Sequence, residues 1–381
     1  MQFIVLSGAY DDPEPSGTAH LTEHLAAFSA DTTVIKRARE RDVNASLYNV
    51  STVYTNSGAP SELETLLRLS RALLDKPKLP PGFAESEIDI IERETLLRER
   101  NSPYLWLSRI ALQNLYGTLR GRADNMIEDL PKLNLEKAYQ FHQDHYVPSN
   151  VTLIVSGQVS AKKAADLVAE IFGDTEHSEV PDKPWLEIKP DPTLRSVEKV
   201  ASDRLSHDAV QYVKFVDFTD AQSSVDTQGV FFIATNILGE RLSRILYFED
   251  PRFLMLYSDW FFAKNGDLEL SISMELMPGF SLESAHRVLE ETIANLLSEP
   301  ISGKEIREAR RKEIVYAQSI KYKPSDFLYF LKNVASDGFR PISPSTFVEI
   351  LNNTTDQEVL DFAERIVEPS ATSVVLAESI D

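Results

Sequence analysis

Two stretches with the same order of residues decide the fold. VPSNVTLIV at Val147–Val155 places a β-branched run directly behind a proline turn, and EPSATSVVL at Glu368–Leu376 repeats this order. Pro369 lies 221 residues after Pro148, an offset of 221 between the two stretches. A short apolar run bounded by turn residues is typical of a buried strand. We therefore expect a similar strand near the end of each half of the chain.

A second pair of segments also recurs. Glu87-Ile88 opens a charged helical pattern, as Glu305-Ile306 does at an offset of 218. Offsets that agree this closely indicate an ancient duplication, although any two α/β domains share such strand and helix order. The proline-rich stretch Asp174–Ser196 is typical of an extended connection. Because 381 residues exceed one usual core, we predict two domains, residues 1–182 and 183–381.

Composition excludes several classes of protein. The net charge of −20 argues against nucleic acid, because such binding neutralises phosphates with Lys and Arg. It would attract a basic peptide, or serve only to keep the chain soluble. The absence of cysteine excludes disulfides and thiolate metal sites and fits a cytoplasmic location. The apolar start Met1–Leu6 is short and lacks basic residues, so we predict no targeting segment and no membrane span.

The sequence HLTEH at residues 20–24 carries the chemistry. His20 and His24 lie one helical turn apart on one face, where both imidazoles can reach one ion. Glu23 lies beside the same ion and can take a proton from bound water without being a ligand. This is the inverted H-x-x-E-H motif of zinc peptidases. Paired histidines also occur as ordinary surface or core residues, so the motif favours zinc without requiring it.

A catalytic zinc site needs a third protein ligand and an open position. No further histidine lies at a useful spacing, so a carboxylate must be sought. The helical pattern Glu85–Glu99 offers several, and Glu92 and Glu99 lie two helical turns apart, in line on one face. For Glu92 the alternative is a solvated helix face.

The motif, together with the spacing from His24 to Glu99, resembles the pitrilysin and insulinase family of zinc metallopeptidases. Small two-domain members include the subunits of mitochondrial processing peptidase. The resemblance implies an α+β fold, with two related α/β sandwich domains that each pack a mostly antiparallel sheet with helices. It also implies zinc ligands and supporting groups: His20, His24 and Glu99 as ligands, Glu23 as the catalytic base, and Glu92 as a carboxylate that orients the site.

Other segments extend the resemblance to substrate binding. In the family, the strand that matches Asn44-Ala45 binds substrate as an added strand, although Asn44 is equally explained as a turn residue before a strand. The second domain of the family carries an arginine seven positions before a tyrosine, and the pair supports the oxyanion. Here Tyr257 matches the tyrosine, but Asp250 stands in place of the arginine. The resemblance therefore implies a heterodimer whose second subunit lacks the zinc motif and supplies Arg and Tyr.

Together these features predict a zinc-dependent endopeptidase in which Glu23 activates a zinc-bound water to hydrolyse peptides or unfolded segments. The second domain is predicted to be a pseudo-repeat without metal, because an offset of 221 carries His20 onto Arg241. One alternative is a dedicated protease for leader peptides or precursors. Another is a non-catalytic scaffold subunit of a larger complex, against which the intact set of ligands and base weighs.

Overall fold

The computed structural model describes most of the chain. The described residues are 1–13, 15–34, 44–117, 129–175, 178–179, 181–218, 225–250, 252–262, 267–320, 322, 326–331 and 342–380, without the side chains of 99–101, 103, 186, 225, 226 and 262. The chain packs into two compact units. The first comprises Met1–Leu97, Arg122–Glu187 and Pro324–Lys332, and the second comprises Arg98–Gly121, Ile188–Lys323 and Asn333–Asp381.

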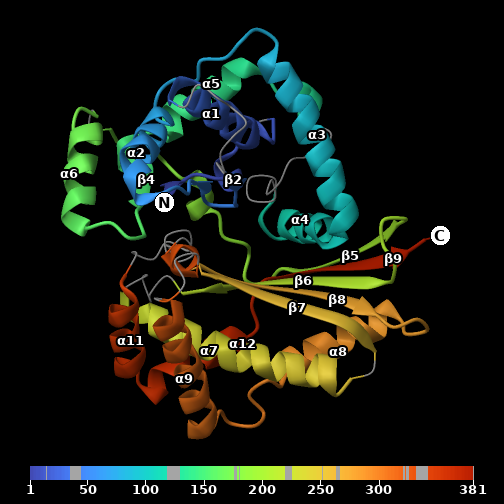
Figure 1. Cartoon of the computed structure of the whole chain (residues 1–381). Helices are drawn as coiled ribbons and strands as arrows, with labels where there is room; N and C mark the ends of the chain where they lie inside the picture. The colour runs from blue at the N-terminus through green and yellow to red at the C-terminus, as the bar shows by residue number, and fades with distance from the viewer. Residues whose placement is uncertain are drawn as a thin grey trace. The chain divides into compact units, whose positions relative to one another are not determined.

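The first unit contains a four-stranded sheet in the order β2-β3-β1-β4 (Figure 1). Its strands are β1 (Gln2–Val5), β2 (Asn44–Leu47), β3 (Thr52–Thr55) and β4 (Val151–Ile154). Every neighbouring pair is antiparallel. Among the described strands, β2 therefore forms one edge of this sheet, with β3 as its neighbour.

Helix α1 (Thr18–Val34) is the central helix of the first unit. Its small residues Ala19, Ala26 and Ala30 pack with Phe3 and Tyr54 of the sheet. Small side chains let a helix approach a sheet closely, and almost the whole first half of α1 is buried. The other helices of the unit are α2 (Leu63–Ala72), α3 (Phe83–Asn101), α5 (Leu135–His145) and α6 (Ala161–Phe172).

A second face of α1 packs against α3. Leu21 and Leu25 of α1 form one buried cluster with Ala84 and Ile91 of α3. Burial of such side chains stabilises the contact by about 1.5–3 kcal/mol each. The contact places the polar residues of α3 that flank Ile91 beside the first turns of α1.

The connection between the units is anchored to the first of them. Lys183 forms an ion pair with Asp11 at 3.2 Å, and the indole of Trp185 donates a hydrogen bond to the same carboxylate at 2.9 Å. The predicted division after residue 182 thus lies just before this anchored segment, and the second unit resumes at Ile188. The second unit also takes α4 (Pro103–Tyr116) from within the first half of the sequence.

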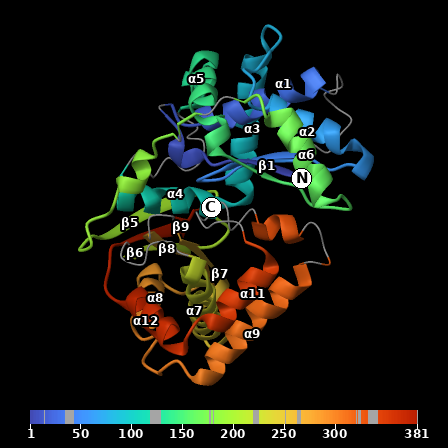
Figure 2. The ribbon, with the colours of Figure 1, turned by 90° about the vertical axis from the view of Figure 1, so that its left-hand side faces the viewer.

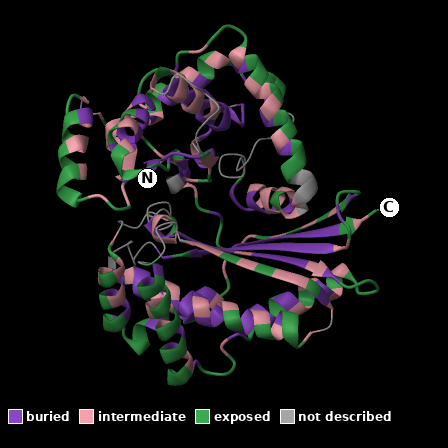
Figure 3. Cartoon of the chain, in the orientation of Figure 1, coloured by how far each residue is buried: buried purple, intermediate pink, exposed green. Residues whose placement is uncertain are grey.

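The second unit contains a five-stranded sheet in the order β5-β9-β6-β8-β7. Its strands are β5 (Arg195–Ser202), β6 (Ala209–Asp217), β7 (Phe253–Phe262), β8 (Asp267–Leu276) and β9 (Thr372–Ser379). Only the β5–β9 pair is parallel among these neighbours. The central strands are buried along most of their length (Figure 3), because helices cover both faces of the sheet.

Helix α4 lies on one face of this second sheet, in contact with β6 and β9 (Figures 1 and 2). The opposite face is covered by α7, α8 and α12. Their bounds, with those of the two further helices, are α7 (Val225–Ser243), α8 (Leu282–Ala294), α9 (Gly303–Ile320), α11 (Pro344–Asn353) and α12 (Asp356–Val367). No described helix is long and apolar enough to cross a membrane.

The two sheets share one strand order. Across the first sheet the strand order β4-β1-β3-β2 corresponds to β9-β6-β8-β7 across the second. Along the chain, α1 follows β1 as α7 follows β6. Strand β5 has no counterpart among the described strands of the first unit. The predicted α+β fold with two related, mostly antiparallel sheets packed with helices is confirmed.

The structure corrects one detail of the repeat. The starts of β1 and β6 (2 and 209) are related by an offset of 207. The starts of β4 and β9 (151 and 372) are related by an offset of 221. The offset therefore grows along the chain as loop lengths differ. His20 lies in the first turn of α1, whereas Arg241 lies in the last turn of α7, so the predicted match of His20 to Arg241 is wrong.

Candidate metal centre

Two aspartates fix the start of α1. Asp12 accepts hydrogen bonds from the backbone amides of Gly17 and Ala19, and Asp129 accepts one from Ser16. Carboxylates at a helix N-terminus bind amides that lack an intrahelical partner and are favoured by the helix dipole. Gly17 has a φ of 97°, a conformation that suits glycine. The first turn of α1, which carries His20, therefore begins at a fixed point.

The two histidines of the motif converge. Their Nε2 atoms lie 3.2 Å apart, and the ring planes are inclined by 79°. His20 is buried, with 1% of its surface exposed, and His24 is partly buried. One turn of helix brings both imidazoles to one point.

Glu94 of α3 completes a group of three. Its Oε2 atom lies 3.5 Å from His20 Nε2 and 3.8 Å from His24 Nε2. Ligand atoms about 2.0–2.1 Å from a tetrahedral zinc ion lie about 3.3–3.4 Å from one another. The triangle formed by His20, His24 and Glu94 therefore has about the size that zinc requires, and its donors are of the types that zinc prefers.

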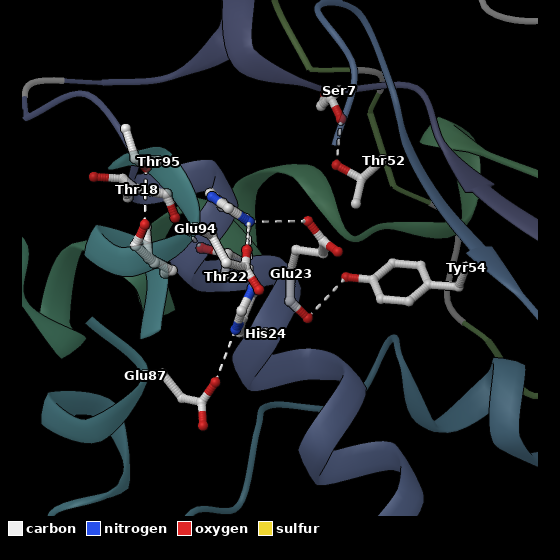
Figure 4. Close-up of polar contacts among 12 residues, drawn as sticks. Ser7, Thr18, Thr22, Glu23, His24, Thr52, Tyr54, Glu87, Glu94 and Thr95 are labelled. Carbon is white, nitrogen blue, oxygen red and sulfur yellow. Dashed lines mark hydrogen bonds and ion pairs between the residues drawn. The ribbon is translucent and has the colours of Figure 1, made fainter. Parts of the chain in front are cut away.

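Glu87 orients one of the histidines. Its Oε2 atom lies 2.8 Å from His24 Nδ1 (Figure 4). When Nδ1 donates to this carboxylate, the lone pair of Nε2 faces His20 and Glu94. Burial lowers the pKa of His24, but the hydrogen bond to Glu87 and the nearby charges of Glu23 and Glu94 outweigh it and raise the pKa above its usual value.

Glu23 lies beside the three ligand atoms. It is 5% exposed, and its Oε2 atom is 3.9 Å from His20 Nε2, too far for a shared proton but close enough to reach a small molecule between them. Its backbone carbonyl faces β3, where the hydroxyl of Tyr54 donates to it at 3.4 Å (Figure 4). A carboxylate in this position can accept a proton from water held near the histidines.

The structure brings Glu87 and Glu94 to the site, whereas the sequence pattern predicts Glu92 and Glu99. Glu92 is exposed on α3, and the side chain of Glu99 lies outside the described residues. Glu94 and Glu99 are five positions apart, so they differ by about 140° around the helix and about 7.5 Å along it. The ligand role predicted for Glu99 stays a prediction.

A sequence signal for the missed pair did exist. Glu87 and Glu94 have the same seven-residue spacing as Glu92 and Glu99. They lie on the face of α3 that also carries Ile91, which is fully buried against α1. The apolar face of the helix, more than the distance along the sequence, identifies the carboxylates that point inward.

The predicted substrate-binding residues lie on two strands of different units. Asn44 and Ala45 are in β2, where Asn44 is exposed and Ala45 is partly buried. Tyr257 lies in β7 and is 60% exposed. Asp250 pairs with the guanidinium of Arg252, a hydrogen-bonded contact that lowers the pKa of Asp250. The substrate roles of Asn44, Ala45 and Tyr257 stay predictions.

Comparisons with known proteins agree with this architecture. Residues 132–313 match the model of the peptidase M16 inactive domain, a segment that begins after the histidine motif. No curated protein matches the chain.

Several solved structures share the fold along nearly the whole chain. A protease from Helicobacter pylori is 17% identical with a TM-score of 0.82, covering 99% of this chain and 93% of that one. The first half of the periplasmic protease PqqL from Escherichia coli is 13% identical with a TM-score of 0.73, covering 99% and 86%. A peptidase M16 inactive domain from Pseudomonas fluorescens is 16% identical with a TM-score of 0.75, covering 100% and 92%.

At these identities the structural likeness shows the fold, and the sequence match of residues 132–313 supplies the relationship. Residues 132–313 are thus similar in sequence to the peptidase M16 inactive domain, and the chain shares its fold along nearly its whole length with proteases and with an M16 inactive domain.

Proposed function

We propose that the chain is a zinc-dependent endopeptidase in which His20, His24 and Glu94 hold the metal. The observation that carries the proposal is the triangle of their three ligand atoms, with edges of 3.2, 3.5 and 3.8 Å. In this proposal Glu94 takes the ligand role predicted for Glu99, and Glu87 takes the orienting role predicted for Glu92.

The chain's own residues account for the proton transfers. Zinc at this position supplies a Lewis acid that polarises a carbonyl and lowers the pKa of water. Glu23 accepts a proton from the attacking water and returns it to the leaving amine. Glu87 keeps Nδ1 of His24 protonated, so that Nε2 faces the metal position.

An extended peptide or unfolded segment is the substrate that best fits the first unit. Strand β2 is at the edge of the described sheet and runs antiparallel to β3, so its outer backbone groups can pair with one more strand. Such pairing recognises backbone and places few demands on the side chains of the substrate. Removal of a leader from a peptide or precursor is a narrower form of the same reaction.

The proposed function is tested by metal content and turnover on one preparation. The purified chain, alone and mixed with candidate partner chains, is dialysed against zinc and assayed by atomic emission and with a library of fluorogenic peptides. We expect one zinc per chain and hydrolysis that a chelator abolishes and zinc restores. The absence of both zinc and turnover in every mixture would refute the peptidase and favour the scaffold.

We further propose that a second family member completes the active enzyme. Support comes from Asp250, which stands where the family carries an arginine and is already bound to Arg252. A carboxylate cannot donate to a developing oxyanion. The expected result is a heterodimer by light scattering, with activity only in the mixture. A fully active monomer or homodimer of this chain would contradict it.

Glu87→Gln is expected to weaken zinc binding by about 10–100-fold without abolishing it, because it neutralises the carboxylate that orients His24. The raised pKa of His24 should fall in this variant, since the hydrogen bond to Glu87 is the largest cause that raises it. Protons then compete with zinc for His24 only at lower pH. Zinc titrations from pH 5 to 8 measure both effects, with Glu85→Gln, an exposed carboxylate on the same helix, as the matched control.

A further inference from the structure

Two buried tyrosine hydroxyls meet next to the backbone of Glu23. Tyr54 lies in β3, and Tyr146 directly follows the last residue of α5. The exposed fractions of these residues are 0% and 3%, respectively. Their hydroxyl oxygens lie 2.7 Å apart, and the Tyr54 oxygen lies 3.4 Å from the Glu23 carbonyl oxygen. The pair thus joins a strand and two helices of the first unit at the position of the proposed base.

The hydrogen bonds of the pair have one consistent direction. A tyrosine hydroxyl has one proton, so if Tyr54 donates to the Glu23 carbonyl, Tyr146 must donate to Tyr54. Burial raises the pKa of both hydroxyls, so both are protonated donors at neutral pH. A helical carbonyl can accept this second bond because it has two lone pairs.

Packing holds the two rings in place. The Tyr54 ring makes edge contacts with Phe3 and Tyr146, with centroids 6.4 and 6.2 Å away. The Tyr146 ring stacks on His142 at 4.6 Å. His142 is itself held by a hydrogen bond from its Nε2 to the Leu73 carbonyl at 2.8 Å. The hydroxyls therefore have a fixed direction toward α1.

Tyr54 also belongs to the part of the sheet that would receive substrate. In the antiparallel register of β2 and β3, Tyr54 lies directly opposite Ala45. One residue thus touches both the edge strand β2, through its backbone, and the turn of α1 that carries Glu23, through its hydroxyl. We infer that Tyr54 and Tyr146 are positioning residues that hold Glu23 at a fixed place relative to a peptide bound along β2. This inference rests on the proposed function.

The test removes one hydroxyl at a time. Tyr54→Phe, Tyr146→Phe and the double variant are compared with Tyr139→Phe, which removes a hydroxyl from α5 that donates to the Pro77 carbonyl instead. We measure kcat, KM, zinc affinity and amide hydrogen exchange of the peptide that covers residues 20–28. The control should leave kcat and this exchange unchanged.

We expect Tyr54→Phe to lower kcat about tenfold, the worth of one hydrogen bond, with KM and zinc affinity unchanged. Tyr146→Phe should lower kcat by a smaller factor, and the double variant should equal Tyr54→Phe, because Tyr146 acts through Tyr54. Exchange in residues 20–28 should be faster in all three. An unchanged kcat, or a higher KM at constant kcat, would overturn the inference.

The exchange measurement separates this inference from the proposed function. If the wild-type chain hydrolyses no peptide under any condition, the proposed function fails, but exchange still reports whether the hydroxyl pair holds the turn of Glu23. Equal exchange in the wild type and in Tyr54→Phe would then overturn the inference on its own.

Discussion

Replacing Glu23 with glutamine should abolish peptide hydrolysis while zinc stays bound. Glutamine has nearly the same shape but cannot accept the proton of the attacking water, and a general base contributes about 10²–10⁴-fold to the rate. Because Glu23 is outside the group of three ligand atoms, the zinc content of Glu23→Gln should equal that of the wild type. Turnover of a fluorogenic peptide and atomic emission on the same sample provide the two measurements.

A matched control makes this result specific. Glu92→Gln makes the same change of charge on α3, but Glu92 is exposed. It should keep both activity and zinc. If Glu23→Gln retains the turnover of the wild type at equal zinc content, Glu23 is not the base. If Glu92→Gln is the inactive variant, the orienting role predicted from the sequence belongs to Glu92 after all.

Glu94→Gln should weaken zinc binding by at least about 100-fold, because it removes one of three protein ligands, a larger change than the loss of an orienting group. Glu99→Gln should leave the affinity within about twofold of the wild type, because the proposed ligand set is complete without Glu99. Competition with a chromophoric chelator measures both dissociation constants on freshly stripped protein.

The pair of variants decides between the two assignments. Loss of zinc in Glu99→Gln with full retention in Glu94→Gln would restore the ligand predicted from the sequence and would require α3 to be turned about its axis. Thermal unfolding without metal provides the control for folding. Glu94 has 40% of its side chain exposed, so its substitution should not disturb the core in the metal-free state.

The fold was largely predictable because its signals are local. The strand expected within Val147–Val155 is β4, and the helical patterns of residues 135–145 and 161–172 coincide with α5 and α6. Each has a clear boundary, such as the side-chain cap of Ser160 on α6. The approach of His20 to His24 was equally predictable, since it depends on one turn of a single helix.

The carboxylate that lies beside the two histidines was harder to predict, because its position depends on how α3 is rotated against α1. Leu96 and Leu97 next to Glu99 suggest an inward face, yet they are 47% and 56% exposed. Ile91, which directly precedes the charged residues Glu92 and Arg93, is the side chain that packs in the core. Helix rotation is set by contacts between distant segments, and neither propensity nor spacing along the chain reveals it.

The offset between the two halves of the chain was also hard to predict from the sequence alone. Two anchors near the ends of each half gave offsets of 218 and 221, and a constant offset then assigned Arg241 to the position of His20. Loops of different length shift the first strands to an offset of 207, which the β1–β6 pair shows only in three dimensions. Arg241 instead donates to the carbonyls of Leu296 and Glu299 and to the carboxylate of Glu305.

The helix that follows β6 in the second unit differs in a telling way from α1. Phe231 is 4% exposed and forms edge contacts with Phe232. A helix that leads out of the same strand order thus places an imidazole beside carboxylates in one copy and a benzene ring inside the core in the other. Duplication would have freed the second copy from keeping polar groups in its interior, so its sequence could change toward a better-packed core while the first copy kept the residues that its chemistry needs.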